Sequence, residues 1–223
     1  MVDLGRDTNL KDFPADTMTA ISSRLSVESS RMKRLLDIVC ALLLFLFVLP
    51  LLLVVALCVV VDSRGPVFFV QRRTGLGGAP IRVFKFRTMK VMEDGGAVRH
   101  AGKDDKRVTR VGKFLRRSSI DELPQLINVL QGNMSLVGPR PHALAHDQYY
   151  GALVPHYAHR FRARPGITGL AQVNGLRGEI HSLDGMVDRV TQDNAYIDTW
   201  SFGMDLKILI KTALVAAFQS SAY

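Results

Sequence analysis

The chain has 223 residues, a formal net charge of +9 and 48% hydrophobic residues. This length fits one domain with appendages, and it can bury a core without disulfides or zinc. The mean hydropathy is +0.13 although 22% of the residues are charged, so the apolar residues must be concentrated in one part of the chain. A wholly soluble globule and a disordered chain are both excluded.

Residues 1–30 are polar, rich in Asp, Ser and Thr, and show no sustained periodicity. This composition predicts a disordered polar tail. We do not expect a signal peptide, because no short apolar stretch follows a basic start at the terminus.

An apolar run without any charged residue extends from Ile38 to Val61. As one straight helix it would reach about 36 Å, which is enough to cross the roughly 30 Å core of a bilayer. A single transmembrane helix is therefore the simplest interpretation. The only two cysteines, Cys40 and Cys58, lie inside this run, where they act as small hydrophobic residues.

Two features favour a different path for the segment 31–64. Pro50 lies near the middle of the run, where it removes a backbone hydrogen bond and kinks a helix. Basic residues flank both ends, and the positive-inside rule places both flanks in the cytoplasm. We therefore predict a re-entrant membrane helix, kinked at Pro50, that enters and leaves on the same side. The basic residues are Arg31, Lys33 and Arg34 before the run and Arg64, Arg72 and Arg73 after it.

A strongly basic segment follows the apolar one. Residues 63–119 contain 15 Lys or Arg against 4 Asp or Glu, while the flanking parts of the chain are close to neutral. Such a segment indicates an anionic partner: a phosphorylated small molecule, an anionic lipid headgroup or a nucleic acid.

Residues 65–223 predict an α+β domain that is mainly helical. Two strand-like stretches, 67–70 and 81–86, flank a Gly- and Pro-rich turn and form a small β-hairpin. Residues 93–106 are typical of a mobile surface loop. Helical patterns follow from Val111, including 122–130 and 205–218. The apolar face of the last helix could pack on the core or lie in the membrane interface.

Generic phosphate and metal motifs fail in this sequence. The nearest Walker-like stretch has Ala97 in place of its first glycine and Asp104 in place of its final Ser or Thr. His142 and His146 have a spacing that zinc could use on a helix, but no HExxH glutamate lies between them, and solvated or capping histidines are the preferred interpretation. The same holds for His156 and His159.

The pair Asp121-Glu122 is the most informative polar feature. On its own it could be the acidic start of a helix, with Ser119 or Asp121 as the N-cap and Pro124 in the first turn. The two arginines just upstream favour a phosphate-handling site instead. One carboxylate could then act as a nucleophile whose pKa is kept low by the positive field, and the other could hold Mg²⁺.

Candidate phosphate-binding groups surround this pair in the sequence. Lys85 and Arg87 share one face of a predicted strand. The same pattern would also arise if both cations were simply exposed to solvent. Gly138-Pro139-Arg140-Pro141 fixes an arginine between two prolines, either as a rigid turn or as a pre-organised phosphate ligand. The full set comprises Lys85, Arg87, Arg116, Arg117, Pro139, Arg140 and Pro141.

Seven motifs taken together are far more specific than any one of them. They are Lys33-Arg34-x-x-Asp37, Gly65-Pro66-Val67-Phe68-Phe69-x-Gln71-x-Arg73, Lys85-Phe86-Arg87-Thr88-Met89, Asp121-Glu122-Leu123-Pro124-Gln125, Asn128-Val129-Leu130-x-Gly132, Ser135-Leu136-Val137-Gly138-Pro139-Arg140-Pro141 and Pro165-Gly166-Ile167-Thr168-Gly169. In this order, across roughly residues 31–212, they resemble the bacterial sugar transferase family, the monotopic polyprenyl-phosphate phosphoglycosyl transferases.

The resemblance implies an enzyme bound to the bacterial inner membrane at its cytoplasmic face. It would move a sugar-1-phosphate from a UDP-sugar to undecaprenyl phosphate and release UMP, the first step of exopolysaccharide, capsule or O-antigen synthesis. Asp121 would attack the β-phosphate and form a phosphosugar–aspartyl intermediate, and Glu122 would help to hold Mg²⁺. Asp193 matches a further acid of the family and would contact the substrate.

Within the family, residues 169–179 and 200–201 resemble hexose-1-phosphate transferases that act on UDP-glucose or UDP-galactose. The helix break of the family is often Ser-Pro, whereas this chain has Leu49-Pro50, so Pro50 must bend the helix with other help. The resemblance also implies membrane lipids as partners and is compatible with a homodimer.

Two other classes of protein remain as alternatives. The basic segment would suit a membrane-anchored module that binds anionic lipid or nucleic acid, but the acidic pair beside it and the lack of a nucleic-acid motif argue against nucleic acid. A bitopic structural protein would place its two termini on opposite sides of the membrane.

Overall fold

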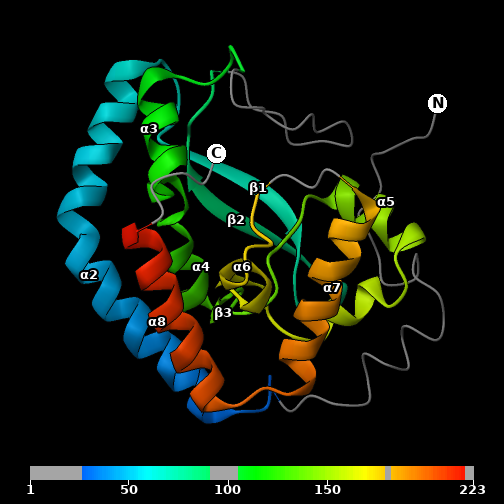
Figure 1. Ribbon diagram of the computed structural model, residues 1–223. Coiled ribbons are helices and arrows are strands. Elements are labelled where there is room, and N and C mark those ends of the chain that lie inside the picture. Colours follow the sequence, from blue (N-terminus) through cyan, green and yellow to red (C-terminus); the bar gives the residue numbers. More distant parts are fainter. Residues whose placement is uncertain (1–26, 91–104, 179–181, 219–223) are drawn as a thin grey trace.

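The computed structural model describes residues 27–90, 105–178 and 182–218, and Figure 1 shows their arrangement. The described chain is mostly helical and contains two small two-stranded sheets. Its elements are α2 (Arg31–Asp62), β1 (Phe68–Thr74), η2 (Leu76–Gly78), β2 (Pro80–Phe86), α3 (Arg110–Ser118), η3 (Ile120–Glu122), α4 (Gln125–Gln131), β3 (Ser135–Val137), α5 (Leu144–Leu153), η4 (Tyr157–Arg162), β4 (Gly166–Thr168), α6 (Leu170–Val173), α7 (Leu183–Asp198) and α8 (Phe202–Phe218).

The apolar run forms one continuous helix, α2, which follows a curved path along one side of the molecule (Figure 1). Of the described helices, it is the one long and apolar enough to cross a membrane. One stripe along α2 packs on the core, with Ala41, Leu52, Val55 and Val59 buried. Large apolar side chains elsewhere on α2 are exposed, among them Leu43, Phe47, Leu53, Leu57 and Val61. One side of the helix therefore serves the fold, and the other side remains apolar without a protein partner among the described residues.

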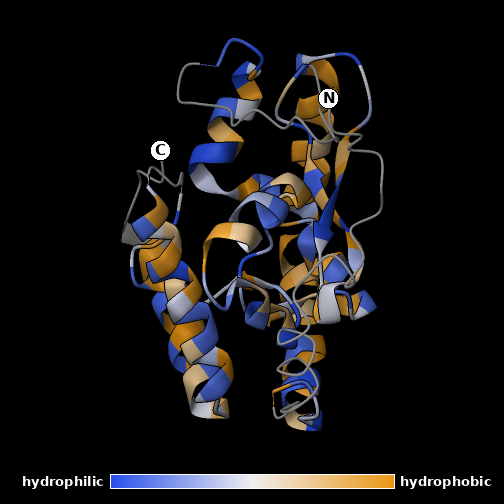
Figure 2. Cartoon of the chain, turned by 90° about the vertical axis from the view of Figure 1, so that its right-hand side faces the viewer, coloured by the Kyte–Doolittle hydropathy of each residue, from blue (hydrophilic) through white to orange (hydrophobic). Residues whose placement is uncertain are grey.

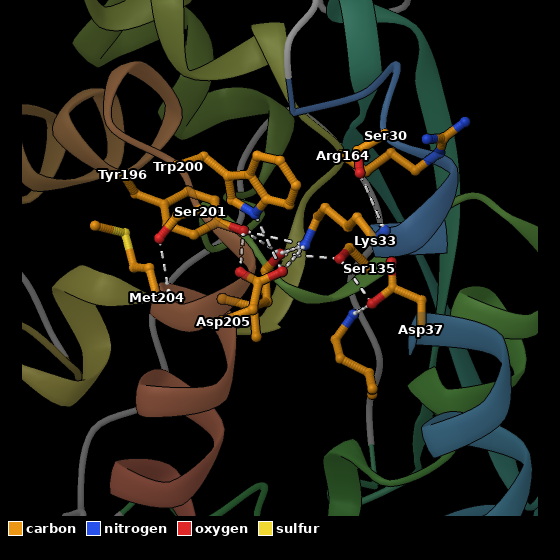
Figure 3. A network of polar contacts seen from close by, with 12 residues as sticks. Ser30, Lys33, Asp37, Ser135, Arg164, Tyr196, Trp200, Ser201, Met204 and Asp205 are labelled. Atoms are coloured by element: carbon orange, nitrogen blue, oxygen red, sulfur yellow. Dashed lines mark hydrogen bonds and ion pairs between the residues drawn. The ribbon is translucent and has the colours of Figure 1, made fainter. Parts of the chain in front are cut away.

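The first turns of α2 are attached to the domain by polar side chains. The Lys33 Nζ donates to Asp205 Oδ2 of α8 (2.9 Å), to the Val137 carbonyl (3.0 Å) and to the Tyr196 hydroxyl (3.1 Å). Figure 3 shows this amine enclosed between α2, α7 and α8. One turn later, Asp37 accepts hydrogen bonds from the backbone of β3 and the hydroxyl of Ser135.

Arg34 is also used inside the protein. Its guanidinium donates to the carbonyls of Val129 and Leu130 at 2.7 and 2.9 Å, where it satisfies acceptors in the last turn of α4. The sequence predicted that Lys33 and Arg34 flank the membrane segment as free basic residues. In the structure both side chains instead donate hydrogen bonds to acceptors within the protein.

The predicted hairpin is confirmed. β1 and β2 pair antiparallel from Phe68 opposite Phe86 to Thr74 opposite Pro80. Asn128 of α4 fixes the hairpin to the helical part, because its amide accepts from Phe84 N (3.0 Å) and donates to the Arg82 carbonyl (2.6 Å). This side chain is fully buried, so the hairpin and α4 form one unit.

A second, parallel pair of strands, β3 and β4, has no counterpart in the sequence prediction. Ser135 pairs with Gly166 and Val137 with Thr168. Gly138 and Gly166 allow the backbones to meet, because a Cβ on Gly138 would lie 2.4 Å from the Arg164 carbonyl oxygen and one on Gly166 would lie 2.1 Å from Gly138 N. Strands of three residues are too short for an alternating pattern to identify them.

The far side of the molecule from α2 carries α5 and α7 (Figure 1). Figure 2 views this side and shows helices in which hydrophilic and hydrophobic residues alternate, as amphipathic helices on a core require. The expected C-terminal helix exists as α8. It buries Ile208 but leaves Leu206, Ile210 and Leu214 substantially exposed.

Several boundaries differ from the sequence prediction. The first strand extends beyond the predicted 67–70 to Thr74, and α8 begins at Phe202 rather than at 205. Residues 27–30 do not continue a disordered tail, because Val27 is buried, Glu28 pairs with Arg164, and Ser30 caps α2 by accepting from Lys33 N. Residues 1–26 and most of the predicted loop 93–106 lie outside the described residues. The predicted helix 122–130 begins later, since Glu122 belongs to η3 and α4 starts at Gln125.

Candidate active site

The acidic pair lies on η3, a single helical turn between α3 and α4. Ser119 ends α3 in the left-handed conformation (φ 57°, ψ 17°), which turns the chain sharply before Asp121. Pro124 then precedes α4 in a helical conformation and has no N–H to satisfy. The simple helix-start interpretation is therefore wrong in detail, because neither Ser119 nor Asp121 caps α4 through its side chain.

Glu122 is held by two cations from distant parts of the chain. Its Oε1 accepts from Lys85 Nζ at 2.8 Å and from Arg140 Nη2 at 2.6 Å, and its Oε2 accepts from Arg140 Nη1 at 3.1 Å. Burial alone would raise the pKa of Glu122, but the charges of Arg140 and Lys85 outweigh it and hold the pKa well below its usual range. Glu122 is therefore a fixed anion that aligns both cations.

Asp121 has a different environment, and no hydrogen bond from a described residue reaches its carboxylate. Burial and the neighbouring charge of Glu122 raise the pKa of Asp121 to about 6, against the opposing charges of Lys85, Arg116 and Arg140. The expectation of a depressed pKa at the nucleophile is thus wrong, because desolvation and the adjacent anion exceed the positive field. The carboxylate remains mostly ionised at pH 7, and its charge is poorly compensated.

The loop that carries Arg140 is fixed from behind. Gly138 N donates to the Thr168 carbonyl and Gly166 N to the Pro139 carbonyl, both at 2.9 Å, so the β3–β4 pair holds the start of the loop. The Arg160 Nη2 donates to the Arg140 carbonyl at 2.6 Å. These bonds place the Arg140 guanidinium on Glu122 before any ligand binds.

Asp193 lies behind this loop. Its Oδ2 accepts from Arg160 Nη2 at 2.7 Å and from Arg160 Nε at 3.2 Å, and both side chains are 2% exposed. The resemblance implied that Asp193 contacts the substrate. In the structure it instead supports Arg160, which in turn supports Arg140.

Arg87 does not join the acidic pair. It lies one residue beyond the end of β2, is buried, and donates only to oxygens of residues 63–66. The expectation that Lys85 and Arg87 offer two cations on one strand face to a phosphate is therefore not met. Lys85 faces Glu122, and Arg87 is occupied by the chain that follows α2.

The other candidates are distributed around the pair. Arg116, in the last turn of α3, contributes its charge to Asp121, whereas Arg117 is exposed on the same helix. Pro139 and Pro141 line a small recess beside Arg140, together with Thr74 and His142. The structure thus unites Asp121, Glu122, Lys85, Arg116 and Arg140 in one site.

Sequence reasoning missed Arg160, which positions Arg140, and it gave no role to Asn128, which stood only within a family motif and positions the hairpin. Each is defined by partners far away in the chain, so nothing in the local sequence identifies it. Arg177 lies within the stretch 169–179 that resembles hexose-1-phosphate transferases, and its guanidinium donates to the hydroxyl of Ser119, two residues before Asp121.

His142 of the histidine pair lies in a buried polar cluster. The Nδ1 of His142 is 2.6 Å from Arg160 Nη1 and 2.7 Å from the Tyr157 hydroxyl. Burial, reinforced by the charge of Arg160, holds the pKa of His142 well below its usual range. Among the described residues, no three His, Cys, Asp or Glu side chains gather as a metal-binding group.

The carboxylate pair nevertheless fits the donor set that Mg²⁺ prefers, one or two carboxylates completed by phosphate oxygens. Asp121 accepts no hydrogen bond from the described residues, and Glu122 Oε2 accepts only one. Both residues retain oxygen lone pairs for a cation.

The comparisons with known proteins agree on one family. A family model described as bacterial sugar transferase matches residues 28–219. A Caulobacter vibrioides protein named UDP-glucose:undecaprenyl-phosphate glucose-1-phosphate transferase is 51% identical over 223 residues, which cover 100% of this chain and 81% of that protein.

Two further relatives show how the matched length varies. An Escherichia coli protein of the same name is 50% identical over 199 residues, 89% of this chain but 43% of that protein. The exopolysaccharide production protein PSS of Rhizobium leguminosarum is 44% identical over 187 residues, 82% of this chain and 94% of that protein. The chain therefore spans less than half of the E. coli relative and most of the other two.

Proposed function

The chain belongs to the bacterial sugar transferase family, and from this premise we propose that it transfers glucose-1-phosphate from UDP-glucose to undecaprenyl phosphate. The observation that carries the proposal is the contrast within the acidic pair: Glu122 is held by Lys85 and Arg140, while Asp121 is half-buried and receives no hydrogen bond from the described residues. The names of the relatives from C. vibrioides and E. coli support glucose as the sugar.

The first step is an attack by a carboxylate oxygen of Asp121 on the β-phosphorus of UDP-glucose. A bond forms between this oxygen and phosphorus, and the bond between phosphorus and the bridging oxygen breaks. That oxygen leaves with the electron pair as part of UMP. The environment of Asp121 suits it to this role, because few groups neutralise its charge. An ionised carboxylate without hydrogen bonds needs little desolvation before it attacks.

The second step regenerates the carboxylate. An oxygen of undecaprenyl phosphate bonds to the phosphorus of the aspartyl intermediate, and the bond to Asp121 breaks with return of its electron pair. The products are the free enzyme and a lipid diphosphate-linked glucose. Such a product would start an exopolysaccharide, as the name of the R. leguminosarum relative suggests.

The cations supply electrostatic stabilisation. In phosphoryl transfer the protein chiefly positions groups and neutralises charge on the transferred phosphate. Lys85, Arg116 and Arg140 all act on Asp121 electrostatically, so a phosphate in contact with Asp121 would lie in the same field. Arg140 can also offer a bidentate contact. Arg117, which is exposed on α3, remains a candidate for binding a substrate phosphate.

Mg²⁺ completes the proposal. Glu122 Oε2 and Asp121 would hold the ion, which when bound neutralises phosphate oxygens of the donor. Glu122 would meanwhile keep Lys85 and Arg140 in place, so its role extends beyond metal binding.

The attachments of α2 support a monotopic membrane arrangement. Lys33 ties its first turn to β3, α7 and α8, and Asp62 Oδ2 at its last residue accepts from Val111 N of α3 at 3.0 Å. A helix that crossed the bilayer would separate its ends by about 30 Å of hydrocarbon. Since both ends bind the same polar domain, we infer that α2 enters and leaves one leaflet, bent near Pro50, with its exposed apolar side chains toward lipid.

This arrangement would place the site at the cytoplasmic face of the inner membrane, where a soluble UDP-sugar meets a lipid phosphate. Accessibility of a tag at residue 1 and of a second tag at the C-terminus tests it. Both should be cytoplasmic, and a periplasmic N-terminus with a cytoplasmic C-terminus would exclude the re-entrant helix.

The decisive activity test uses purified chain with UDP-glucose, Mg²⁺ and undecaprenyl phosphate. We expect UMP release and, before the lipid is added, a hexose-phosphate adduct on the intact protein by mass spectrometry. Asp121→Asn should form neither product. Salt-sensitive DNA binding without UMP release would favour a basic binding module instead.

A further inference from the structure

All five N–H groups of the Arg87 guanidinium donate hydrogen bonds to the segment that follows α2. Its Nε donates to the Pro66 carbonyl (2.6 Å), its Nη1 to Ser63 Oγ (2.8 Å) and the Arg64 carbonyl (2.9 Å), and its Nη2 to the carbonyls of Ser63 (2.7 Å) and Gly65 (3.2 Å). A guanidinium has five N–H groups, so none is left for a substrate. We call this arrangement, Arg87 with residues 63–66, the exit clamp.

The sequence around the exit clamp explains why it is needed. α2 has no basic residue in its last turn, so nothing there offsets the partial negative charge at its C-terminus. Gly65 adopts φ +128°, and a Cβ at this position would lie 3.3 Å from the Arg87 guanidinium. The backbone therefore wraps closely around one buried cation.

The same junction fixes the start of α3. Asp62 accepts from Val111 N, Thr109 N donates to the Thr88 carbonyl at 3.0 Å, and Gly112 packs so tightly on Thr88 that a Cβ would lie 2.1 Å from its carbonyl oxygen. α3 leads directly into η3 and Asp121. The exit of the membrane helix is thus braced against the helix that delivers the acidic pair.

The connection to the site runs along one strand. Lys85, which binds Glu122, lies two residues before Arg87. The strand itself is held to α4 by Asn128 through Phe84 and Arg82, so Lys85 keeps its place without help from Arg87. The exit clamp therefore fixes α2 relative to a site that is already assembled.

We propose that Arg87 is a positioning residue which sets the height of the membrane helix relative to Asp121, so that a phosphate carried in the membrane meets the loaded carboxylate. The inference rests on the proposed function. A UDP-sugar is soluble and reaches the site without guidance from α2, whereas a polyprenyl phosphate is confined to the leaflet in which α2 lies. Loss of the exit clamp should slow the second step and spare the first.

The test measures the two steps separately, with the full chain in lipid nanodiscs. Loading is followed by UMP release and the adduct mass without acceptor, and transfer by a chase with undecaprenyl phosphate in the same nanodisc. Arg87→Gln should leave the rate of loading unchanged and slow transfer about 10- to 100-fold, the effect expected of a misplacement of about 1 Å. A short, water-soluble prenyl phosphate should restore the rate of transfer.

Two further variants keep the test decisive. Arg64→Gln removes an equal charge from an exposed side chain of the same segment and should change neither step. Ser63→Ala removes one acceptor of Arg87 and should give a smaller selective loss of transfer, which serves if Arg87→Gln does not fold. Equal loss of both steps in Arg87→Gln and Ser63→Ala, or a loss in Arg64→Gln as large as in Arg87→Gln, would overturn the inference. If the unaltered chain neither releases UMP nor forms an adduct, it is the proposed function that fails.

Discussion

The ionised carboxylate of Asp121 opposes folding, so replacing it with the isosteric amide should abolish activity and stabilise the protein. Burial and the charge of Glu122 raise the pKa of Asp121 from 3.8 to about 6. A shift of this size corresponds to about 3 kcal/mol between the two protonation states, since one pKa unit is about 1.4 kcal/mol. The proposed nucleophile thus carries a stability cost that Asn would remove.

The pH dependence follows from the sign of the shift. The folded protein binds the proton of Asp121 more tightly than the unfolded chain does, so this group stabilises the fold below about pH 4 relative to higher pH. That contribution is lost as the pH rises through about 6. The advantage of Asp121→Asn over the unaltered chain should therefore be absent near pH 4, grow to about pH 6 and stay constant above it.

Thermal unfolding in nanodiscs at pH 4, 6 and 8 measures this difference. The fluorescence of Trp200, the single tryptophan, reports the α7–α8 junction, where its indole donates to Asp205. For a chain of this length, about 3 kcal/mol corresponds to a rise in Tm of roughly 6–12 °C. This is the largest rise that we expect for Asp121→Asn. Glu122→Gln is the matched control: the lowered pKa of Glu122 means that its ionised form stabilises the fold, so this variant should lose stability at pH 8. A lower Tm for Asp121→Asn at pH 8, or a gain that does not change with pH, would refute the reasoning.

Four other outcomes are expected. The rate of UMP release by the unaltered chain should fall about tenfold per pH unit below an apparent pKa of about 6. Lys85→Met should move this fall in rate to higher pH, because Lys85 lowers the pKa of Asp121. A fall that begins only near pH 4 would contradict both expectations. Asp193→Asn should lower the Tm, because it leaves the buried guanidinium of Arg160 without its anion. It should also raise the KM for UDP-glucose through Arg160, and an unchanged Tm would count against it. Lys33→Met should lower Tm by a similar amount, because it leaves a fully buried carboxylate without its cation, and equal stability at pH 8 would argue that the pair is not needed.

The parts of the fold that local pattern specifies were predictable. The hairpin follows from two strand-like stretches on either side of a glycine-rich turn, and β1 and β2 pair antiparallel as expected. The apolar run yields α2, and the acidic pair yields the site. In each case neighbours along the chain determine the structure.

The remaining features depend on contacts between distant segments. Nothing near Asp193 indicates that its partner is Arg160, 33 positions earlier, and nothing near Arg87 indicates that it binds the turn after α2. The pKa of Asp121 was misjudged for the same reason: the sequence shows how many cations are nearby, but it does not show how much water the fold removes. Desolvation is a property of packing, and here it exceeds the charges.

Five of the described basic residues therefore fall into two groups with different roles. Lys33, Arg34 and Arg87 donate to carbonyls, a hydroxyl and a carboxylate at the two ends of α2, and these fixed partners occupy N–H groups that a phosphate would need. Lys85 and Arg140 meet on Glu122, where a substrate phosphate can still reach them, because their side chains are 20% and 25% exposed. If the first group fixes the membrane helix and the second serves the phosphate, variants of the two should separate: loss of the first should affect delivery of the lipid, and loss of the second should affect both steps of transfer.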